Sequence, residues 1–194
     1  MREFSGSRRT NETNIEVSLK FDEGETGSID TGIGFFDHML QQVAKHGQLQ
    51  INIKAEGDLH VDDHHTIEDV GLLLGRGLLE SLGDKKGIKR YSTIFTPMDD
   101  ALSMVSIDFS GRPYLHFDVA YRGERVGEFE VELVEEFFRA LAMSSAITLH
   151  IRSLYGKNNH HMIETIFKAF GRALREATTV DPTIKGVLST KGTL

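Results

Sequence analysis

The sequence predicts an α+β fold built from two copies of one unit, each running strand, strand, helix, strand, helix. The first observation behind this is that the pattern HHxxE occurs twice, at residues 64–68 and 160–164. The second is that the stretches after the two copies also align at an offset of 96, so that Gly75 falls on Gly171. Two equal clusters in matching contexts indicate that one ancestral half was duplicated.

Hydrophobic periodicity places the elements of each half. Apolar residues that alternate with polar ones predict strands, and apolar residues three and four apart predict helices. In the first half, we expect strands at 13–21, 25–30 and 49–53, and helices at 35–46 and from 64. In the second half, the ranges are 101–109, 114–120 and 147–151 for strands, and 134–144 and from 160 for helices. Helices that alternate with strands in this way pack on one face of a sheet.

The segment boundaries follow from this alignment. We expect the first half at 1–92, the second half at 93–180 and a C-terminal tail at 181–194 that closes over a substrate. Upstream of the HHxxE helices the alignment continues at an offset of 98, so the two halves differ by two residues in one loop. A length change in a surface loop is what a duplicated fold tolerates.

The composition indicates an ordinary soluble protein. The chain has 194 residues, 39% hydrophobic residues, no cysteine and a net charge of -7. It contains no apolar run of the roughly 20 residues that a membrane-spanning helix needs, and no signal-peptide pattern. The acidic balance disfavours a nucleic-acid partner, and the absence of cysteine excludes disulfides and fits the cytoplasm.

Each HHxxE pattern predicts a metal cluster. Neighbouring residues on a helix point about 100° apart, whereas residues three or four apart share a face. Either His64 or His65 can therefore join Glu68 on one ion, while the other histidine serves a second ion. The same alternatives hold for the second copy. Each cluster can thus supply ligands to two metals.

The duplication extends the ligand set beyond the motif. At an offset of 98, His38 corresponds to Glu136, and both side chains can bind metal. Histidine and carboxylate ligands without cysteine suit manganese, iron or zinc. The candidate ligands, four for each of two ions, are His38, His64, His65, Glu68, Glu136, His160, His161 and Glu164.

Other polar residues give weaker signals. The residues alone predict ordinary polar roles for four further histidines, His46, His60, His116 and His150. Acidic residues beside the first motif, Asp62, Asp63 and Asp69, are candidates to orient imidazole rings. Two short tracts, 110–113 with Arg112 and 189–192 with Lys191, are candidates to bind an anion such as phosphate.

Together the motifs resemble a known family. FFDHML, DDHHTIED, SGRPY, NNHHMIETIFKAFGRAL and STKG, with RRTNET near the start, are similar to imidazoleglycerol-phosphate dehydratases of histidine biosynthesis. The resemblance covers nearly the whole chain. It implies a duplicated fold like the second domain of ribosomal protein S5, two Mn²⁺ ions per active site, and self-association into a cytoplasmic assembly of 24 subunits whose active sites are shared.

The resemblance also assigns roles to residues. It supports all the metal ligands except Glu136, because many family members have a histidine at that position. It gives catalytic roles to Glu12, Glu68 and Glu164, with Glu12 as the candidate acid and base. The substrate contacts that it implies are Glu12, His38, Gln42, His46, Arg90, Arg112, Lys168, Ser189, Thr190 and Lys191.

The reaction that the resemblance implies is the loss of water from imidazoleglycerol phosphate to give imidazoleacetol phosphate. The carbon proton to be removed is not acidic, so a carboxylate alone is a poor base for it. Two cations that flank the ring would stabilise an imidazolate, which can expel the neighbouring hydroxyl. Two alternatives remain from the residues: a dinuclear metallohydrolase of a phosphorylated metabolite, and a protein that uses metal only for assembly.

Overall fold

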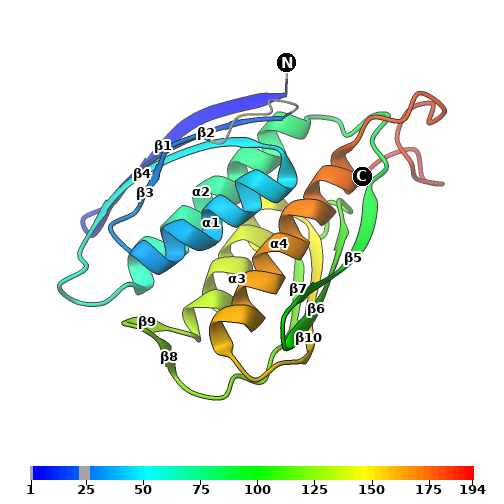
Figure 1. Cartoon of the computed structure of the whole chain (residues 1–194). Helices are drawn as coiled ribbons and strands as arrows, with labels where there is room; N and C mark the ends of the chain where they lie inside the picture. The colour runs from blue at the N-terminus through cyan, green and yellow to red at the C-terminus, as the bar shows by residue number, and fades with distance from the viewer. Residues whose placement is uncertain (1, 22–26) are drawn as a thin grey trace.

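The computed structural model describes residues 2–21 and 27–194 and has the α+β architecture that the sequence predicts. Two four-stranded sheets lie on the outside, and the helices of the described chain lie between them (Figure 1). No helix in the described ranges is long and apolar enough to cross a membrane.

The two halves repeat the same order of elements, apart from a short hairpin, β8–β9, that is found in the second half. The first half contains β1 (Glu3–Arg9), β2 (Thr13–Lys20), β3 (Ile29–Asp30), α1 (Gly34–Gly47), β4 (Gln50–Gly57) and α2 (His64–Leu82). The second half contains β5 (Tyr91–Met98), β6 (Ala101–Asp108), β7 (Tyr114–Asp118), β8 (Arg125–Val126), β9 (Phe129–Glu130), α3 (Leu133–Ser145), β10 (Thr148–Tyr155) and α4 (Asn159–Thr178). The four predicted helices are all present, with bounds close to those expected.

The sheet topology confirms the duplication. The strand orders are β1-β2-β4-β3 and β5-β6-β10-β7, which are the same order in the two halves. Part of the strand expected at 25–30 lies outside the described residues, and its described part is β3. The sequence did not predict β1 and β5, the edge strands that open the two halves. Each contains residues that weaken a strand pattern, namely Gly6 in β1 and Pro97 in β5.

The halves are joined through their helices, each of which packs against a helix of the other half. α1 lies beside α4, and α2 lies beside α3 (Figure 1). The ring of Phe36 in α1 contacts that of Phe137 in α3 edge to face across the two halves, with centroids 5.2 Å apart. Within the second half, Phe137 stacks against Phe167 and Phe138 packs against Phe167 at a tilt, with centroids 5.6 and 5.0 Å apart. These phenylalanines are at most 1% exposed, so burial of their rings is a principal stabilising contribution.

Equivalent glycines permit this close helix packing. A side-chain carbon added at Gly75 of α2 would lie 2.5 Å from the carbonyl oxygen of Leu141 in α3. A carbon added at Gly171 of α4 would lie 2.7 Å from the carbonyl oxygen of Val43 in α1. The two glycines that align in the sequence therefore serve the same contact in the two helix pairs.

Candidate metal centre and substrate site

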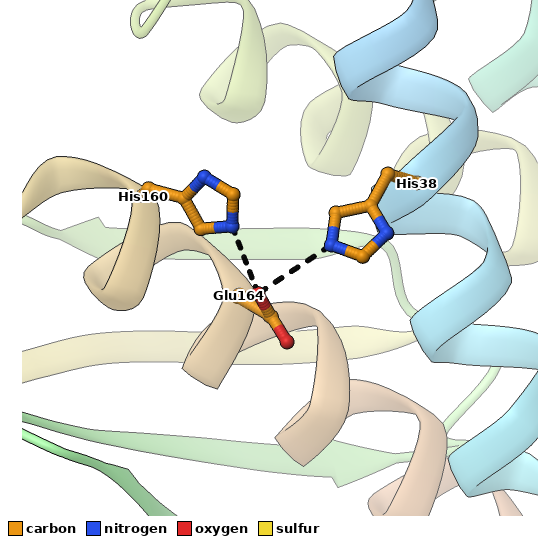
Figure 2. Close-up of side chains that lie close together, drawn as sticks. All are labelled: His38, His160 and Glu164. Carbon is orange, nitrogen blue, oxygen red and sulfur yellow. Dashed lines mark hydrogen bonds and ion pairs between the residues drawn. The ribbon is translucent and has the colours of Figure 1, made fainter.

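The contact between α1 and α4 brings three of the predicted ligands together. Nε2 of His160 lies 3.0 Å from Oε2 of Glu164, and Nε2 of His38 lies 3.5 Å from the same oxygen (Figure 2). The edge of the Phe35 ring packs against His160, with centroids 5.3 Å apart, and helps to orient it. The cluster therefore combines one residue from the first half with two from the second.

The geometry of this cluster fits a divalent ion. The three ligand atoms all lie within 4.8 Å of one another. Neighbouring ligands around an ion with bonds of about 2.1 Å lie roughly 3 Å apart, so small side-chain movements would close the cluster on one ion. Two imidazoles and one carboxylate suit Mn²⁺, iron or zinc. The cluster holds the first histidine of HHxxE with its glutamate, which is the arrangement expected under one of the alternatives that the sequence left open.

Further predicted residues continue along the same two helices. Lys168, one turn beyond Glu164, places its Nζ 2.7 Å from Oε1 of that carboxylate. Burial raises the pKa of Glu164, but hydrogen bonds from Lys168 and His160 outweigh burial and hold this pKa below its usual value. On α1, Nε2 of Gln42 lies 3.5 Å from Nδ1 of His38.

His46 lies one turn beyond Gln42 in a basic surface pocket. Burial is the main cause that lowers the pKa of His46, and the charges of Lys168 and Arg172 lower it further. A pocket of about 500 Å³ is lined there by His46, Arg172 and Arg175 among others. The side chains along α1 and α4, called the α1–α4 surface below, therefore run from the His38–His160–Glu164 cluster to a region of positive charge.

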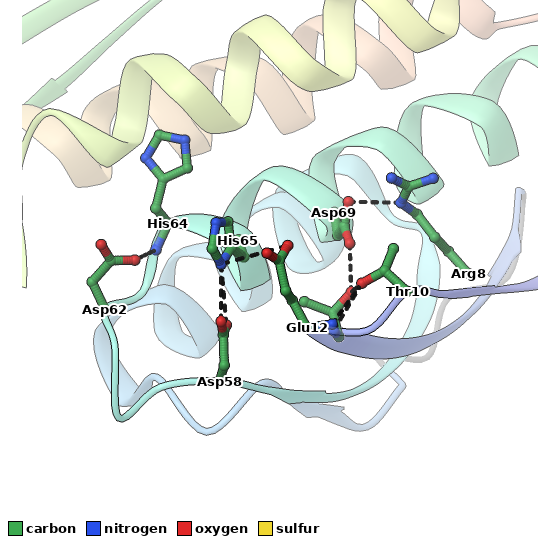
Figure 3. A network of polar contacts seen from close by, with 9 residues as sticks. Arg8, Thr10, Glu12, Asp58, Asp62, His64, His65 and Asp69 are labelled. Carbon is green, nitrogen blue, oxygen red and sulfur yellow. Dashed lines mark hydrogen bonds and ion pairs between the residues drawn. The ribbon is translucent and has the colours of Figure 1, made fainter.

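A second acidic and histidine cluster lies at the start of α2. Nδ1 of His65 lies 3.0 Å from Oδ2 of Asp58 and 3.7 Å from Oε2 of Glu12 (Figure 3). The rings of His64 and His65 are 6.2 Å apart and nearly perpendicular. The two adjacent histidines thus serve different surroundings, as the helix geometry predicts.

The second motif repeats this separation. Nδ1 of His161 lies 2.6 Å from Oδ1 of Asp100, in the turn between β5 and β6, while His160 faces Glu164. Sequence reasoning did not single out Asp58 or Asp100. The acidic pair of residues 99–100 in a short turn between two strands was the available signal for the latter.

The predicted ligands on α2 and α3, which are His64, Glu68 and Glu136, do not come together in one cluster. Among residues 2–21 and 27–194, the two groups with three ligand atoms within 4.8 Å are His38–His160–Glu164 and Glu12–Asp58–His65. Neither contains Glu136, whose carboxylate lies 3.7 Å from Nε of Arg139. His64 and Glu68 are half-buried on α2, and neither belongs to one of these two groups. Ligation by these three residues stays a prediction.

The predicted anion-binding residues gather far from both clusters. A cavity of about 800 Å³ is lined by Arg90, Arg112 and the tail, including residues 189–191. Arg90 is 7% exposed, and its guanidinium pairs with Asp108 at 2.7 Å and donates to the carbonyl oxygen of Leu188, also at 2.7 Å. Arg90 therefore fastens the tail to the second sheet and also faces the cavity.

Two interpretations of the acidic residues beside the first motif are wrong. Asp62 accepts a hydrogen bond from the backbone N–H of His64 at 2.8 Å and does not orient an imidazole. Asp69 is buried and binds Arg8 at 2.6 Å and the hydroxyl of Thr13. Asp63 is the N-cap residue of α2 without a side-chain capping hydrogen bond. The carboxylates that contact imidazole nitrogens in the role expected of these residues are Asp58 and Asp100.

The fold is shared with solved structures of one enzyme class. A structure of imidazoleglycerol-phosphate dehydratase from Staphylococcus aureus is 44% identical, with a TM-score of 0.84, covering 92% of this chain and 99% of that one. A structure of the enzyme from Pyrococcus furiosus in complex with (S)-C348 is 40% identical, with a TM-score of 0.85, covering 97% of this chain and all of that one.

The family is identified by sequence as well. The family model described as imidazoleglycerol-phosphate dehydratase matches residues 31–174. The relative of that name from Alkaliphilus metalliredigens is 65% identical over 193 residues, covering 100% of this chain and 99% of the relative. The chain belongs to the imidazoleglycerol-phosphate dehydratase family of enzymes.

Proposed function

We propose that this protein dehydrates imidazoleglycerol phosphate to imidazoleacetol phosphate in histidine biosynthesis, with two Mn²⁺ ions per active site. The observation that carries the proposal is the His38–His160–Glu164 cluster, followed along the same helices by polar and cationic side chains. A ligand with an imidazole ring at one end and a phosphate at the other matches this sequence of groups. Membership of the family supports the same substrate.

The residues of the α1–α4 surface have distinct tasks in this proposal. The three clustered side chains hold a metal at the imidazole end. Gln42 contacts His38 and stands beside the carbon chain of the substrate. Lys168 and His46 lie one and two turns further along their helices, toward the phosphate. With the pKa of His46 lowered, its ring is neutral at physiological pH and can both donate and accept a hydrogen bond.

His38, His160 and Glu164 would hold an ion at the imidazole end of the substrate, where its positive charge would lower the barrier to loss of the neighbouring hydroxyl. Glu12 is the proposed acid and base. Its side chain is 54% exposed at the β1–β2 turn, 3.7 Å from His65, so it is accessible and close to a ligand histidine. A carboxylate that is not itself a ligand can move a proton between the substrate carbon and the departing oxygen.

We propose that one active site contains residues from more than one copy of the chain. His160 opens α4 and the tail follows its end, on the opposite side of the molecule (Figure 1). A helix of 20 residues is about 30 Å long at about 1.5 Å per residue. This span far exceeds a substrate of one ring, three carbons and one phosphate. Arg112 and Lys191 can therefore reach the phosphate only from a neighbouring copy, as in an assembly of 24 subunits.

The reaction is tested by assay of the Mn²⁺-loaded protein with imidazoleglycerol phosphate. The expected product is the ketone, detected by its enolisation in alkali, with no release of inorganic phosphate. Release of phosphate would instead support the alternative, a dinuclear metallohydrolase that uses the same ligands to activate water. Full metal loading without either product would overturn both functions.

The shared site is tested by co-expression of two inactive variants. Glu164→Gln removes a ligand, and Arg112→Leu removes an anion-binding residue at the other end of the chain. If sites are shared, mixed assemblies regain activity, because some sites receive an intact residue from each chain. Mixed assemblies as inactive as either variant alone would show that each site lies within one chain.

A further inference from the structure

The second histidine of each HHxxE motif makes the same contact, but with acids from different loops. Nδ1 of His65 faces Asp58, which follows β4 on the way to α2. Nδ1 of His161 faces Asp100, in the β5–β6 turn. At the offsets that relate the halves, Asp58 aligns with Leu154 or Gly156, neither of which is acidic. The two contacts are therefore not simply inherited from the duplicated ancestor.

This contact determines which ring nitrogen is free. An ionised carboxylate can only accept a hydrogen bond, so Nδ1 must carry the proton and Nε2 keeps its lone pair. Asp100 acts as an acceptor in this arrangement, because its Oδ2 also accepts hydrogen bonds from the backbone N–H groups of Lys157 and Asn158. Nε2 is then the nitrogen left to bind a metal in both histidines, and in His161 it lies 3.8 Å from Oδ2 of the exposed Asp99.

The β1–β2 turn and the β5–β6 turn each carry an acid near the second histidine of a motif, but only the acid of the β5–β6 turn is hydrogen-bonded to that histidine. In the second half, Asp100 holds His161 itself and accepts hydrogen bonds from the backbone of Lys157 at 2.5 Å and Asn158 at 3.0 Å. In the first half, the corresponding turn carries Glu12, which lies 3.7 Å from His65, beyond hydrogen-bonding distance. The segment between β4 and the first HHxxE motif is two residues longer than the segment between β10 and the second motif, and it contains Asp58, which makes the bond instead.

We propose that Asp58 and Asp100 are positioning residues that fix the ring tautomer of His65 and His161 for metal binding through Nε2, and that Asp58 thereby leaves Glu12 free for proton transfer. The inference rests on the metal-dependent function proposed above. It adds that the longer loop of the first half is what separates the residue that orients the ligand from the residue that moves the proton.

Metal titration tests the positioning role without an activity assay. Metal-stripped full-length protein is titrated with Mn²⁺, and the free ion is measured by electron paramagnetic resonance. We expect Asp58→Ala and Asp100→Ala each to weaken Mn²⁺ binding about 10- to 100-fold, as loss of a ligand-orienting partner does. If Asp58→Ala does not fold, Asp58→Asn keeps an acceptor atom and is expected to show a smaller loss, of a few-fold.

Asp63→Ala is the matched control. It removes the same charge one residue before the motif, but its side chain makes no capping hydrogen bond to α2. We expect its Mn²⁺ affinity to stay within about twofold of the unmodified protein, since only long-range charge is lost. Affinities of the Asp58 and Asp100 variants that match this control would overturn the positioning role.

A double variant tests whether Asp58 leaves Glu12 free. In the unmodified protein, Glu12→Gln is expected to leave Mn²⁺ affinity unchanged. In the Asp58→Ala background, Glu12 becomes the nearest acceptor for Nδ1 of His65, so Glu12→Gln should weaken binding a further several-fold. Additive effects would overturn this division. An unmodified protein that binds no Mn²⁺ would overturn the proposed function itself, which is a different result.

Discussion

The two helix pairs of the duplicated fold carry different side chains at equivalent positions. On α1 and α4, residues four apart carry ligands first and then polar or cationic groups: His38, Gln42 and His46 on one helix, and His160, Glu164 and Lys168 on the other. The equivalent positions on α3 and α2 are Glu136, Ala140 and Ser144, and His64, Glu68 and Leu72. The ligand-type residues occur in both pairs, whereas an amide, an imidazole and a cation at the positions beyond them occur only in the α1–α4 pair.

This difference indicates that the α1–α4 and α2–α3 helix pairs have different functions. Ala140 is buried and Leu72 is apolar, so the α2–α3 pair has no cation at the positions that correspond to Gln42, His46 and Lys168. The hydroxyl of Ser144 donates to the backbone carbonyl of Leu72 and links the two helices at that point. The α1–α4 pair can therefore contact a whole substrate, while the α2–α3 pair is suited to contribute metal ligands.

Loss of a ligand from the α1–α4 cluster is expected to have the largest effect. Glu164→Gln should lower turnover on the order of 1000-fold, because an ion that stabilises the transition state by several kcal/mol is lost. Steady-state kinetics and Mn²⁺ titration measure this change. Glu80→Gln, an exposed residue of α2 paired with Arg76, is the control and should behave as the unmodified protein does. Normal turnover of the Glu164 variant would contradict the role of this cluster.

The next largest effect is expected when Lys168 is replaced by leucine, the residue at the equivalent position of α2. Lys168→Leu should raise KM roughly 10- to 100-fold, since a hydrogen bond from a charged group contributes about 1.5–3 kcal/mol. The matched change in the other pair, Leu72→Met, should leave KM unchanged. Equal KM values in the two variants would remove the asymmetry between the helix pairs.

Conversion of Glu136 to the residue at the equivalent position of α1 tests whether both pairs bind metal. Glu136→His would give the α2–α3 pair the same ligand types as the α1–α4 pair. We expect the affinity for Zn²⁺ relative to Mn²⁺ to rise about tenfold, because imidazole favours zinc more than a carboxylate does. Competition titrations measure the ratio. An unchanged ratio would show that Glu136 is not a ligand.

The smallest expected effect is that of replacing His46 on the pH dependence of folding stability. The pKa of His46 is lower in the folded protein than the ordinary value of about 6.5. The unfolded chain therefore binds more protons near and below this pH, and stability falls as the pH falls through that range. In His46→Gln the decrease in melting temperature from about pH 7.5 to pH 5.5 should be smaller. An identical decrease in both proteins would contradict the lowered pKa.

Local patterns were sufficient for much of the fold and for the ligand residues. The four helices, the buried strands and the correspondence of His38 with Glu136 all follow from periodicity and self-alignment. The edge strands β1 and β5 could not be predicted in this way, because Gly6 and Pro97 interrupt the strand pattern. In the folded protein, pairing with the neighbouring strand overrides this weak local preference. The roles of Asp58 and Asp100 were missed for a related reason, since both acids lie in loops whose path the sequence does not show.

The sequence by itself determined that the protein is a duplicated α+β unit with two HHxxE clusters. Only the tertiary structure decided that α1 packs against α4, so that His38 of one half meets the motif of the other half. Periodicity shows which face of a helix is buried, but not which distant helix covers it. That choice depends on the close approach of backbones at Gly75 and Gly171 and on the contact between the rings of Phe36 in α1 and Phe137 in α3. These contacts form only when segments far apart in the chain come together.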